Sequence, residues 1–275
     1  MEPRLQRRIQ RYGWDLAATD YERLWQAQLA PAHDAVLAHA ALRPGERVLD
    51  VACGTGLVSL AAAEAVRPAG HVLGTDLSQG MVDAARERAA RQGLHHVDFE
   101  RMDAEQLALP DAGFDVALCA LGLMYVPGPE AALRELRRVL RPGGRLVLAV
   151  WGERARCGWS ALFPIVDAEV RSEVCPLFFR LGQLDTLARL CTEAGFGRVE
   201  HQRIATTLRY ADGDEACGAA FAGGPVALAW SRFDSPVRSR VQGRYLDAIA
   251  GWREGQGYRI PGEFVIVSAT TPRVD

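Results

Sequence analysis

Short apolar runs alternate with helical stretches through the middle of the chain, from Arg47 to Val150. Residues 114–122 are apolar except for Asp115, as in a strand that is buried on both faces of a parallel sheet. Alternation of strands and helices favours right-handed crossovers in a doubly wound, mostly parallel α/β sheet. The pattern predicts strands over residues 47–52, 71–76, 96–103, 114–122, 145–151, 198–210 and 263–271, and core helices over 57–66, 78–93, 129–144 and 184–195.

Segments before the core and after its fifth strand interrupt this alternation, and they divide the expected single domain. A helical cap precedes the core, and two aromatic-rich or helical insertions follow the fifth strand. We expect the insertions to cover the carboxyl ends of the strands, where open α/β folds bind ligands. The expected segments are a cap over 1–42, a ligand-binding core over 43–152, lid insertions over 153–183 and 211–258, and further core elements over 184–210 and 259–275.

Composition narrows the classes of partner. The chain has 275 residues, 49% of them hydrophobic, and a formal net charge of -2, with every basic residue an arginine. This balance gives no general attraction to nucleic acid or to an anionic membrane, which favours a small-molecule substrate. The six cysteines form no C-x-x-C pair, so neither a metal site nor a disulfide framework is indicated.

The sequence says less about the cellular location and the oligomeric state of the protein. No apolar run approaches the length of a membrane span, and the basic N-terminus lacks the apolar core of a secretory signal. We therefore expect a cytoplasmic protein. The oligomeric state stays open, a homodimer included.

The stretch "VLDVACGTG" carries the clearest chemical signal. Gly54 and Gly56 follow a strand and precede a helix, where a Cβ would intrude on a bound nucleotide-like ligand. Asp76 ends the second strand, the position that faces ribose hydroxyls in this architecture. Asp50 beside the turn would repel a pyrophosphate and attract an ammonium group, and Ser59 replaces the third glycine of a dinucleotide motif. These features favour S-adenosylmethionine, which is cationic and carries no phosphate.

At this point the sequence resembles the class I S-adenosylmethionine-dependent methyltransferases, in particular the group related to ubiquinone and menaquinone C-methyltransferases. The resemblance covers Arg43 to about Gly152 and extends loosely to the N-terminal helices and the last strand. Ala52 replaces the first glycine of the family motif. Further signatures of the quinone enzymes are not recognisable, so the substrate does not carry over. The matching stretches are "VLDVACGTG", "GTDLSQGMV", "RMDAEQLALPDAGFDVALC" and "LRELRRVLRPGGRLVLAVW".

The resemblance implies roles for individual residues. The glycine turn would border the methionine part of the cofactor, and Asp76 would bind its ribose. Asp103 would accept from the adenine amino group, with the amide of Ala104 at a ring nitrogen. The cofactor-binding residues expected in this way are Tyr21, Asp50, Ala52, Gly54, Gly56, Asp76, Leu77, Met81, Asp103, Ala104, Ala120 and Leu121.

The acceptor site is expected among aromatic residues of the cap and lid, because aromatic faces suit both a planar substrate and a sulfonium charge. For each ring, packing in the core of the lid is an equally good interpretation. The candidates are Trp14, Tyr125, Trp151, Trp159, Phe163, Phe178 and Phe179. No catalytic base stands out; Tyr21, Tyr125 and His33 are weak candidates, and the reaction can proceed without a base if the acceptor is sufficiently nucleophilic.

The favoured function is methyl transfer to an O, C or N atom of a small aromatic or polyketide-like metabolite. A nicotinamide-dependent oxidoreductase is disfavoured by Asp50 and Ser59, and a non-methylating S-adenosylmethionine-binding protein stays open. Arsenite methylation by Cys157, Cys175 and Cys217 is a further hypothesis, weaker than that of scattered structural thiols.

Overall fold

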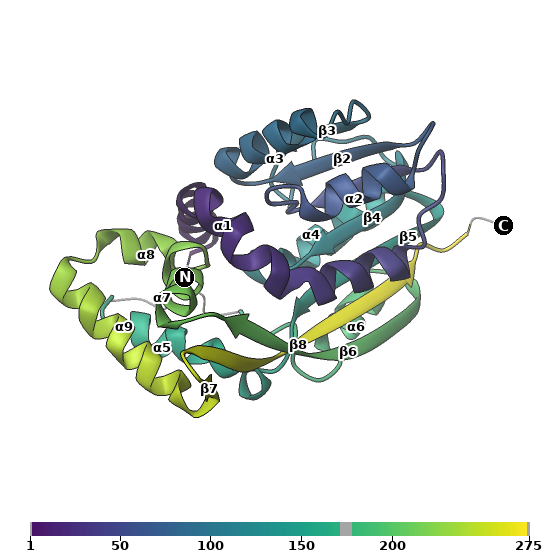
Figure 1. Cartoon of the computed structure of the whole chain (residues 1–275). Coiled ribbons are helices and arrows are strands. Elements are labelled where there is room, and N and C mark those ends of the chain that lie inside the picture. The colour runs from purple at the N-terminus through teal and green to yellow at the C-terminus, as the bar shows by residue number, and fades with distance from the viewer. Residues whose placement is uncertain (1, 171–177, 274–275) are drawn as a thin grey trace.

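The fold is known from a computed structural model, which describes residues 2–170 and 178–273 (Figure 1). Its sheet has the strand order β3-β2-β1-β4-β5-β8-β6, with the short β7 paired to β8. The first five strands are parallel, and β8 is antiparallel to both of its long neighbours. The strands are β1 (Arg47–Val51), β2 (His71–Asp76), β3 (Val97–Arg101), β4 (Phe114–Ala120), β5 (Leu140–Trp151), β6 (Gly197–Tyr210), β7 (Arg253–Glu254) and β8 (Gly257–Thr270).

This arrangement confirms the predicted doubly wound, mostly parallel α/β sheet. The strands β1 and β4 at its centre are mostly apolar, and all of their residues except Arg47 and Ala120 are buried, as expected where helices cover both faces. Ser78 caps α3, its hydroxyl accepting from the Met81 N–H at 3.1 Å. The core helices are α2 (Leu57–Ala65), α3 (Gln79–Arg91), α4 (Pro129–Val139) and α6 (Thr186–Glu193).

Two predicted boundaries are wrong. The helix expected over 129–144 ends at Val139, because Leu140 already pairs with Phe114 in the sheet. A bulge between Phe114 and Val116 then shifts the register before β5 continues. The last strand starts at Gly257, earlier than expected, since it forms a long ladder with β6 and a small hairpin with β7.

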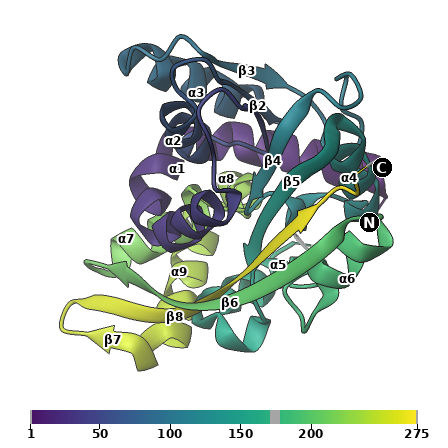
Figure 2. The same cartoon turned by 90° about the vertical axis from the view of Figure 1, so that its right-hand side faces the viewer.

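The helix α1 (Pro3–Ala40) is a single long element that packs along the core and reaches the lid (Figures 1 and 2). Its buried side chains recur at helical spacing and form one buried face, which includes Gln6, Gln10 and Gln28 besides apolar residues. It contacts both α3 of the core and α8 of the second insertion, so it connects the core to that insertion. The buried apolar residues of its second half are Leu24, Trp25, Leu29, Ala32 and Val36.

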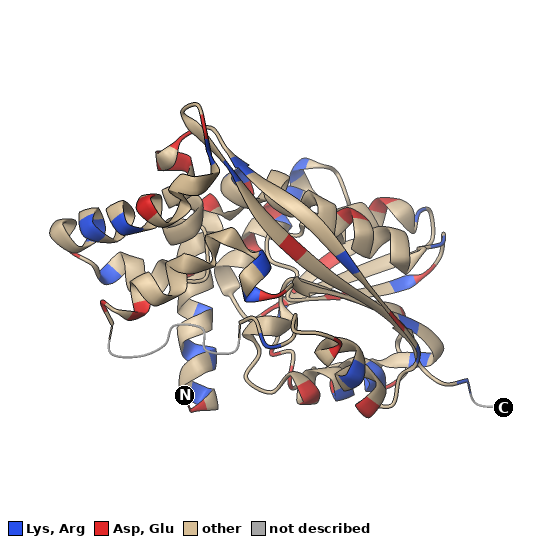
Figure 3. Ribbon diagram, turned by 90° about the horizontal axis from the view of Figure 1, so that it is seen from below, with Lys and Arg blue, Asp and Glu red and all other residues tan. Residues whose placement is uncertain are grey.

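The lid gathers at one end of the sheet (Figure 1). Figure 3 shows acidic and basic residues interspersed over the helices rather than collected in one basic stripe. Among the described helices, none combines the length and the apolar character needed to cross a membrane. The helices of the two insertions are α5 (Leu162–Asp167), α7 (Gly213–Cys217), α8 (Ala227–Arg232) and α9 (Ser235–Ile249), with the short 3-10 helices η2 (Arg154–Arg156), η3 (Gly158–Ala161) and η5 (Ala250–Trp252) and the π-helix η4 (Gly218–Ala222). A further 3-10 helix, η1 (Leu123–Tyr125), follows β4 in the core.

Candidate functional site

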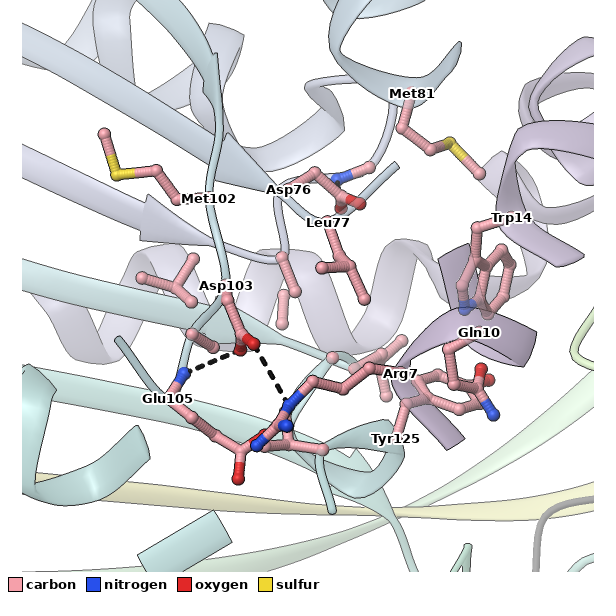
Figure 4. A pocket seen from close by; sticks show the side chains of 18 of the residues that line it. Arg7, Gln10, Trp14, Asp76, Leu77, Met81, Met102, Asp103, Glu105 and Tyr125 are labelled. Carbon is pink, nitrogen blue, oxygen red and sulfur yellow. Dashed lines mark hydrogen bonds and ion pairs between the residues drawn. The ribbon is translucent and has the colours of Figure 1, made fainter. Parts of the chain in front are cut away.

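A cavity with an empty volume of about 750 Å³ lies between α1 and the carboxyl ends of the central strands (Figure 4). We refer to it as the main cavity. Residues expected to bind a cofactor meet here from elements far apart in the sequence. The expected cofactor residues that line it are Tyr21, Ala52, Gly54, Asp76, Leu77, Met81, Asp103, Ala104, Ala120 and Leu121, and Trp14 and Tyr125 join them.

Glycine is found at the two positions of the turn for different structural reasons. Gly54 lines the main cavity at φ +54°, and a Cβ there would lie 3.8 Å from Cε1 of Tyr21. Gly56, at φ +81°, would place a Cβ 3.1 Å from the Phe99 ring and 3.3 Å from Cβ of Ala85. Close packing of the following helix therefore requires Gly56, which is not among the residues lining the main cavity.

Asp76 is held rigidly at the tip of β2. Its Oδ2 accepts from the Gly54 N–H and its Oδ1 from the Ser78 N–H, both at 2.9 Å. Burial raises the pKa of Asp76, and these backbone donors act in the opposite direction. The carboxylate thus fixes the glycine turn while its remaining lone pairs stay available to hydroxyl donors in the main cavity.

Asp103 occupies the far side of the main cavity, where both of its oxygens already have partners (Figure 4). Its Oδ1 accepts from the Glu105 N–H at 3.0 Å, and its Oδ2 lies 3.1 Å from Nε of Arg7. Arg7 also lies 2.7 Å from Oε2 of Glu105. The start of α1 is therefore fastened to the loop that follows β3.

A second tie joins α1 to the opposite rim. Oδ1 of Asp15 accepts from the Ser78 hydroxyl at 2.6 Å and from the Gly80 N–H at 3.0 Å. This places a carboxylate at the N-terminus of α3, where the helix dipole favours negative charge. The helix α1 thereby covers the main cavity from two anchored points.

Asp50 lines a smaller cavity behind the glycine turn, which we call the side cavity. Its Oδ2 accepts from the Ser59 hydroxyl at 2.5 Å, while Oδ1 has no hydrogen-bond partner in the described part of the chain. Burial raises the pKa of Asp50 to about 7. His33 lines the same cavity, and burial lowers its pKa to about 4. A buried carboxylate oxygen without a partner suits a cationic group of a ligand.

A third and narrow cavity is walled mainly by rings, and we call it the aromatic chamber. It adjoins the main cavity, since Trp14, Tyr21, Leu121 and Tyr125 line both. Trp14 contacts Tyr21 and Tyr125 edge to face at 5.7 and 5.1 Å between ring centroids. The other residues of its wall are Trp25, Leu29, Met124, Trp151, Trp159, Phe178, Gly224 and Pro225.

Two rings expected at the acceptor site do not line any of these three cavities. Phe163 and Phe179 each pack against Phe178, with ring centroids 4.8 Å apart, and both are buried in the core. They support the chamber wall from behind. His33 lies in the side cavity and not in the aromatic chamber, so it is poorly placed to take a proton from an acceptor there.

Comparison with known proteins gives the family. A family model described as "Methyltransferase domain" matches residues 48–144. A ubiquinone/menaquinone biosynthesis C-methyltransferase from Laribacter hongkongensis is 30% identical, covering 69% of this chain and 80% of its own. The chain belongs to the class I S-adenosylmethionine-dependent methyltransferases.

Other similar proteins either have names that give no activity or have lower sequence identity to this chain. An uncharacterized protein of Mycobacterium tuberculosis is 38% identical over 135 residues, which is 49% of this chain. The chain spans about half of that protein, 48% of its length. The YcgJ protein of Bacillus subtilis superposes with a TM-score of 0.64 at 19% identity, covering 89% of this chain and 100% of its own. The [4+2]-cyclase SpnF gives 0.58 at 25% identity, covering 93% and 85%.

The residues present fit the family's cofactor, S-adenosylmethionine. A glycine whose Cβ would protrude toward Tyr21 borders the main cavity, and Asp50 offers a buried oxygen without a partner beside it. When bound, the cofactor supplies an electrophilic methyl group on its sulfonium. The chain's own contribution is to fix Asp76, to cover the cavity with α1 and to limit the access of water.

Several lining residues escaped sequence reasoning. Arg7 and Gln10 belong to a basic stretch whose pattern is typical of a solvent-facing helix surface, yet both line the main cavity. Gly122 was missed as well, although an ideal Cβ on it would fall 2.2 Å from that of Ala52. Such a glycine just after a central strand is a usable signal of close backbone contact at the cavity. The others are Val51, Met102, Glu105, Val126 and Pro127.

The cysteines give the arsenite hypothesis no support that can be read from the structure. Cys157 and Cys217 are free and buried, and burial raises the pKa of each to about 12. Cys175 lies outside the described residues. Within the described ranges, no group of His, Cys, Asp and Glu side chains could hold a metal ion.

Proposed function

We propose that this protein transfers the methyl group of S-adenosylmethionine to a small organic acceptor, an aromatic or polyketide-like metabolite. The observation that carries the proposal is the junction of the main cavity with the aromatic chamber, which share Trp14, Tyr21, Leu121 and Tyr125. A cofactor in the first cavity would thus have its reactive end next to an acceptor in the second.

The cofactor would lie with its adenosine between the tips of β2 and β3 and its methionyl part at the glycine turn. Asp76 would accept from ribose hydroxyls, and Leu77 and Met81 would pack on adenine. Asp103 and the amide of Ala104 would recognise the adenine edge. Asp50 would face the ammonium group from the side cavity.

In the proposed mechanism, catalysis depends on the positioning of the cofactor and the acceptor, and no catalytic base is assigned. Holding two reactants in line can supply roughly 7–11 kcal/mol of the barrier. Tyr21 is a poor base, because burial and the nearby Asp76 raise the pKa of its hydroxyl well above the usual value. The aromatic rings around Tyr125 and Trp14 would stabilise the sulfonium by cation–π attraction and exclude water.

Calorimetry with S-adenosylmethionine and S-adenosylhomocysteine tests the cofactor. We expect saturable binding of both, weakened at least tenfold in Asp76→Ala, and no binding of NADH or NADPH in a fluorescence titration. Absence of binding with both sulfur ligands would refute the proposal. Saturable nicotinamide binding would instead favour the oxidoreductase.

A second candidate is a protein that binds the cofactor without transferring its methyl group. This candidate is supported by the similarity to SpnF, which is named as a [4+2]-cyclase and matches 93% of this chain at 25% identity. The two functions differ in one product. A methyltransferase forms S-adenosylhomocysteine with an accepted substrate, whereas the second candidate converts its substrate and leaves S-adenosylmethionine intact.

A further inference from the structure

Two residues that line the aromatic chamber carry hydrogen-bond donors that have no partner in the described chain. The indole N–H groups of Trp25 and Trp159 are buried and have no hydrogen-bond partner there. The two residues are only 5% and 2% exposed, and both line the chamber. A buried tryptophan N–H usually finds a partner, because leaving it unpaired costs about 1–3 kcal/mol.

Packing fixes both indoles, so they cannot readily turn toward other partners. The ring centroids of Trp25 and Trp159 lie 6.4 Å apart, and Trp151 packs against each. Behind Trp25 runs the backbone of Gly223 and Gly224, where added Cβ atoms would lie 3.5 and 3.8 Å from its ring. The donors are therefore preorganised before any ligand arrives.

The rest of the chamber wall restricts what those donors can meet. None of the described residues that line it carries a charge. An anionic ligand would lose its hydration without gaining a cation, and a cationic ligand would meet donors in place of acceptors. A neutral oxygen with two lone pairs is the group that matches.

We propose that the acceptor of this enzyme is a planar, neutral, mainly apolar molecule whose carbonyl oxygen accepts hydrogen bonds from the indoles of Trp25 and Trp159. This inference rests on the proposed function, since it assigns the aromatic chamber to the methyl acceptor. The rings of the chamber recognise the flat frame, and the two indoles select the oxygen and set its orientation toward the main cavity.

The experiment compares two probes of nearly equal shape, 2-acetylnaphthalene and 2-ethylnaphthalene, binding to protein saturated with S-adenosylhomocysteine. We expect calorimetry to give about tenfold tighter binding of the ketone. Trp25→Phe and Trp159→Phe should each reduce that preference about threefold, and the double variant should bind both probes equally. The carboxylate 2-naphthoate should bind more weakly than the ketone.

The control is Trp230→Phe, because Trp230 stacks on Phe221 and does not line the chamber. It should leave the preference unchanged. Equal affinity of wild type for both probes, a preference that survives in the double variant, or tighter binding of the carboxylate would each overturn the inference. S-adenosylhomocysteine binding by each variant is measured separately, and the probes are also titrated without it. Failure of the proposed function is thereby distinguished from failure of the indole recognition.

Discussion

Arg7 and Asp103, far apart in the sequence, form an ion pair across the main cavity, with Arg7 Nε 3.1 Å from Asp103 Oδ2. Arg7 reaches Glu105 as well, at 2.7 Å. The pair joins the first turns of α1 to the loop after β3, so it controls how firmly α1 covers the cavity. It also fixes the carboxylate proposed to recognise adenine.

Replacing Arg7 by Met should weaken S-adenosylhomocysteine binding about fivefold. Both ion pairs are partly exposed, so each contributes no more than about 1 kcal/mol. Calorimetry at low salt and in 0.5 M NaCl measures the effect, which should shrink as salt screens the pair. Arg8→Met on the same helix is the control, because Arg8 is exposed and does not line the cavity. Equal losses in both variants would contradict a specific role for Arg7.

Binding of the cofactor should depend on pH through Asp50. Its pKa is raised to about 7 by burial, and only its ionised form attracts an ammonium group. Affinity for S-adenosylhomocysteine should therefore rise about eightfold from pH 6 to pH 7.5 as the carboxylate loses its proton. In Asp50→Asn the affinity should be lower at pH 7.5 and nearly independent of pH over this range. A wild-type affinity that falls with rising pH would exclude this role.

The same group should affect stability in the opposite direction when no ligand is bound. The pKa of Asp50 is about 7 in the folded chain against an ordinary 3.8, so the folded state binds more protons between these values. Stability therefore declines as pH rises from about 4 to about 7. We expect Asp50→Asn to melt a few degrees above wild type at pH 8, with the difference vanishing near pH 4. Thermal unfolding followed by circular dichroism measures this, and an equal difference at both pH values would count against it.

The alternation of strands and helices and the mostly parallel sheet could be predicted because their causes are local, whereas the cofactor roles of the glycine turn and Asp76 stay predictions. Backbone that must approach a ligand requires a missing Cβ at Gly54, and a carboxylate at a strand tip faces the cavity by the geometry of parallel sheets. Gly56 shows the limit of that argument. The same residue type at the same turn serves packing against Phe99, and no pattern in one sequence separates the two causes.

What escaped prediction depends on contacts between distant segments. Arg7 has the sequence context of a solvated helix face, and only its pairing with Asp103 reveals its place at the site. Phe163 and Phe178 are neighbours in the core, yet only Phe178 reaches the aromatic chamber. Composition predicts that such rings are buried, but the tertiary packing of the lid decides which of them faces a cavity.

Tyr21 should act through its ring rather than its hydroxyl. It lines all three cavities at their junction, beside Gly54, and its raised pKa keeps the hydroxyl neutral. We expect Tyr21→Phe to bind S-adenosylhomocysteine within threefold of wild type. Tyr21→Ala, which removes the wall between the cavities, should bind at least tenfold more weakly. Calorimetry decides between these outcomes, and a large loss in Tyr21→Phe would assign the hydroxyl a direct role.

Gly122 and Ala52 form a size-matched pair in the wall of the main cavity, and exchanging their side chains tests this match. A Cβ on Gly122 would fall 2.2 Å from that of Ala52, so Gly122→Ala should cost about 1–3 kcal/mol of unfolding free energy. Ala52 adopts φ +56°, which glycine tolerates better, so Ala52→Gly alone should change stability by less than about 1 kcal/mol.

The double variant should recover at least half of the loss in Gly122→Ala, because the added methyl group then occupies the space left at position 52. Urea unfolding of the four proteins gives the coupling energy, expected to exceed about 1 kcal/mol in favour of the double variant. Gly243→Ala in α9, where nothing lies within 4 Å of the added Cβ, is the control and should stabilise slightly. Additive effects of the two substitutions would mean that these residues do not limit each other, and that backbone shifts accommodate the extra methyl group.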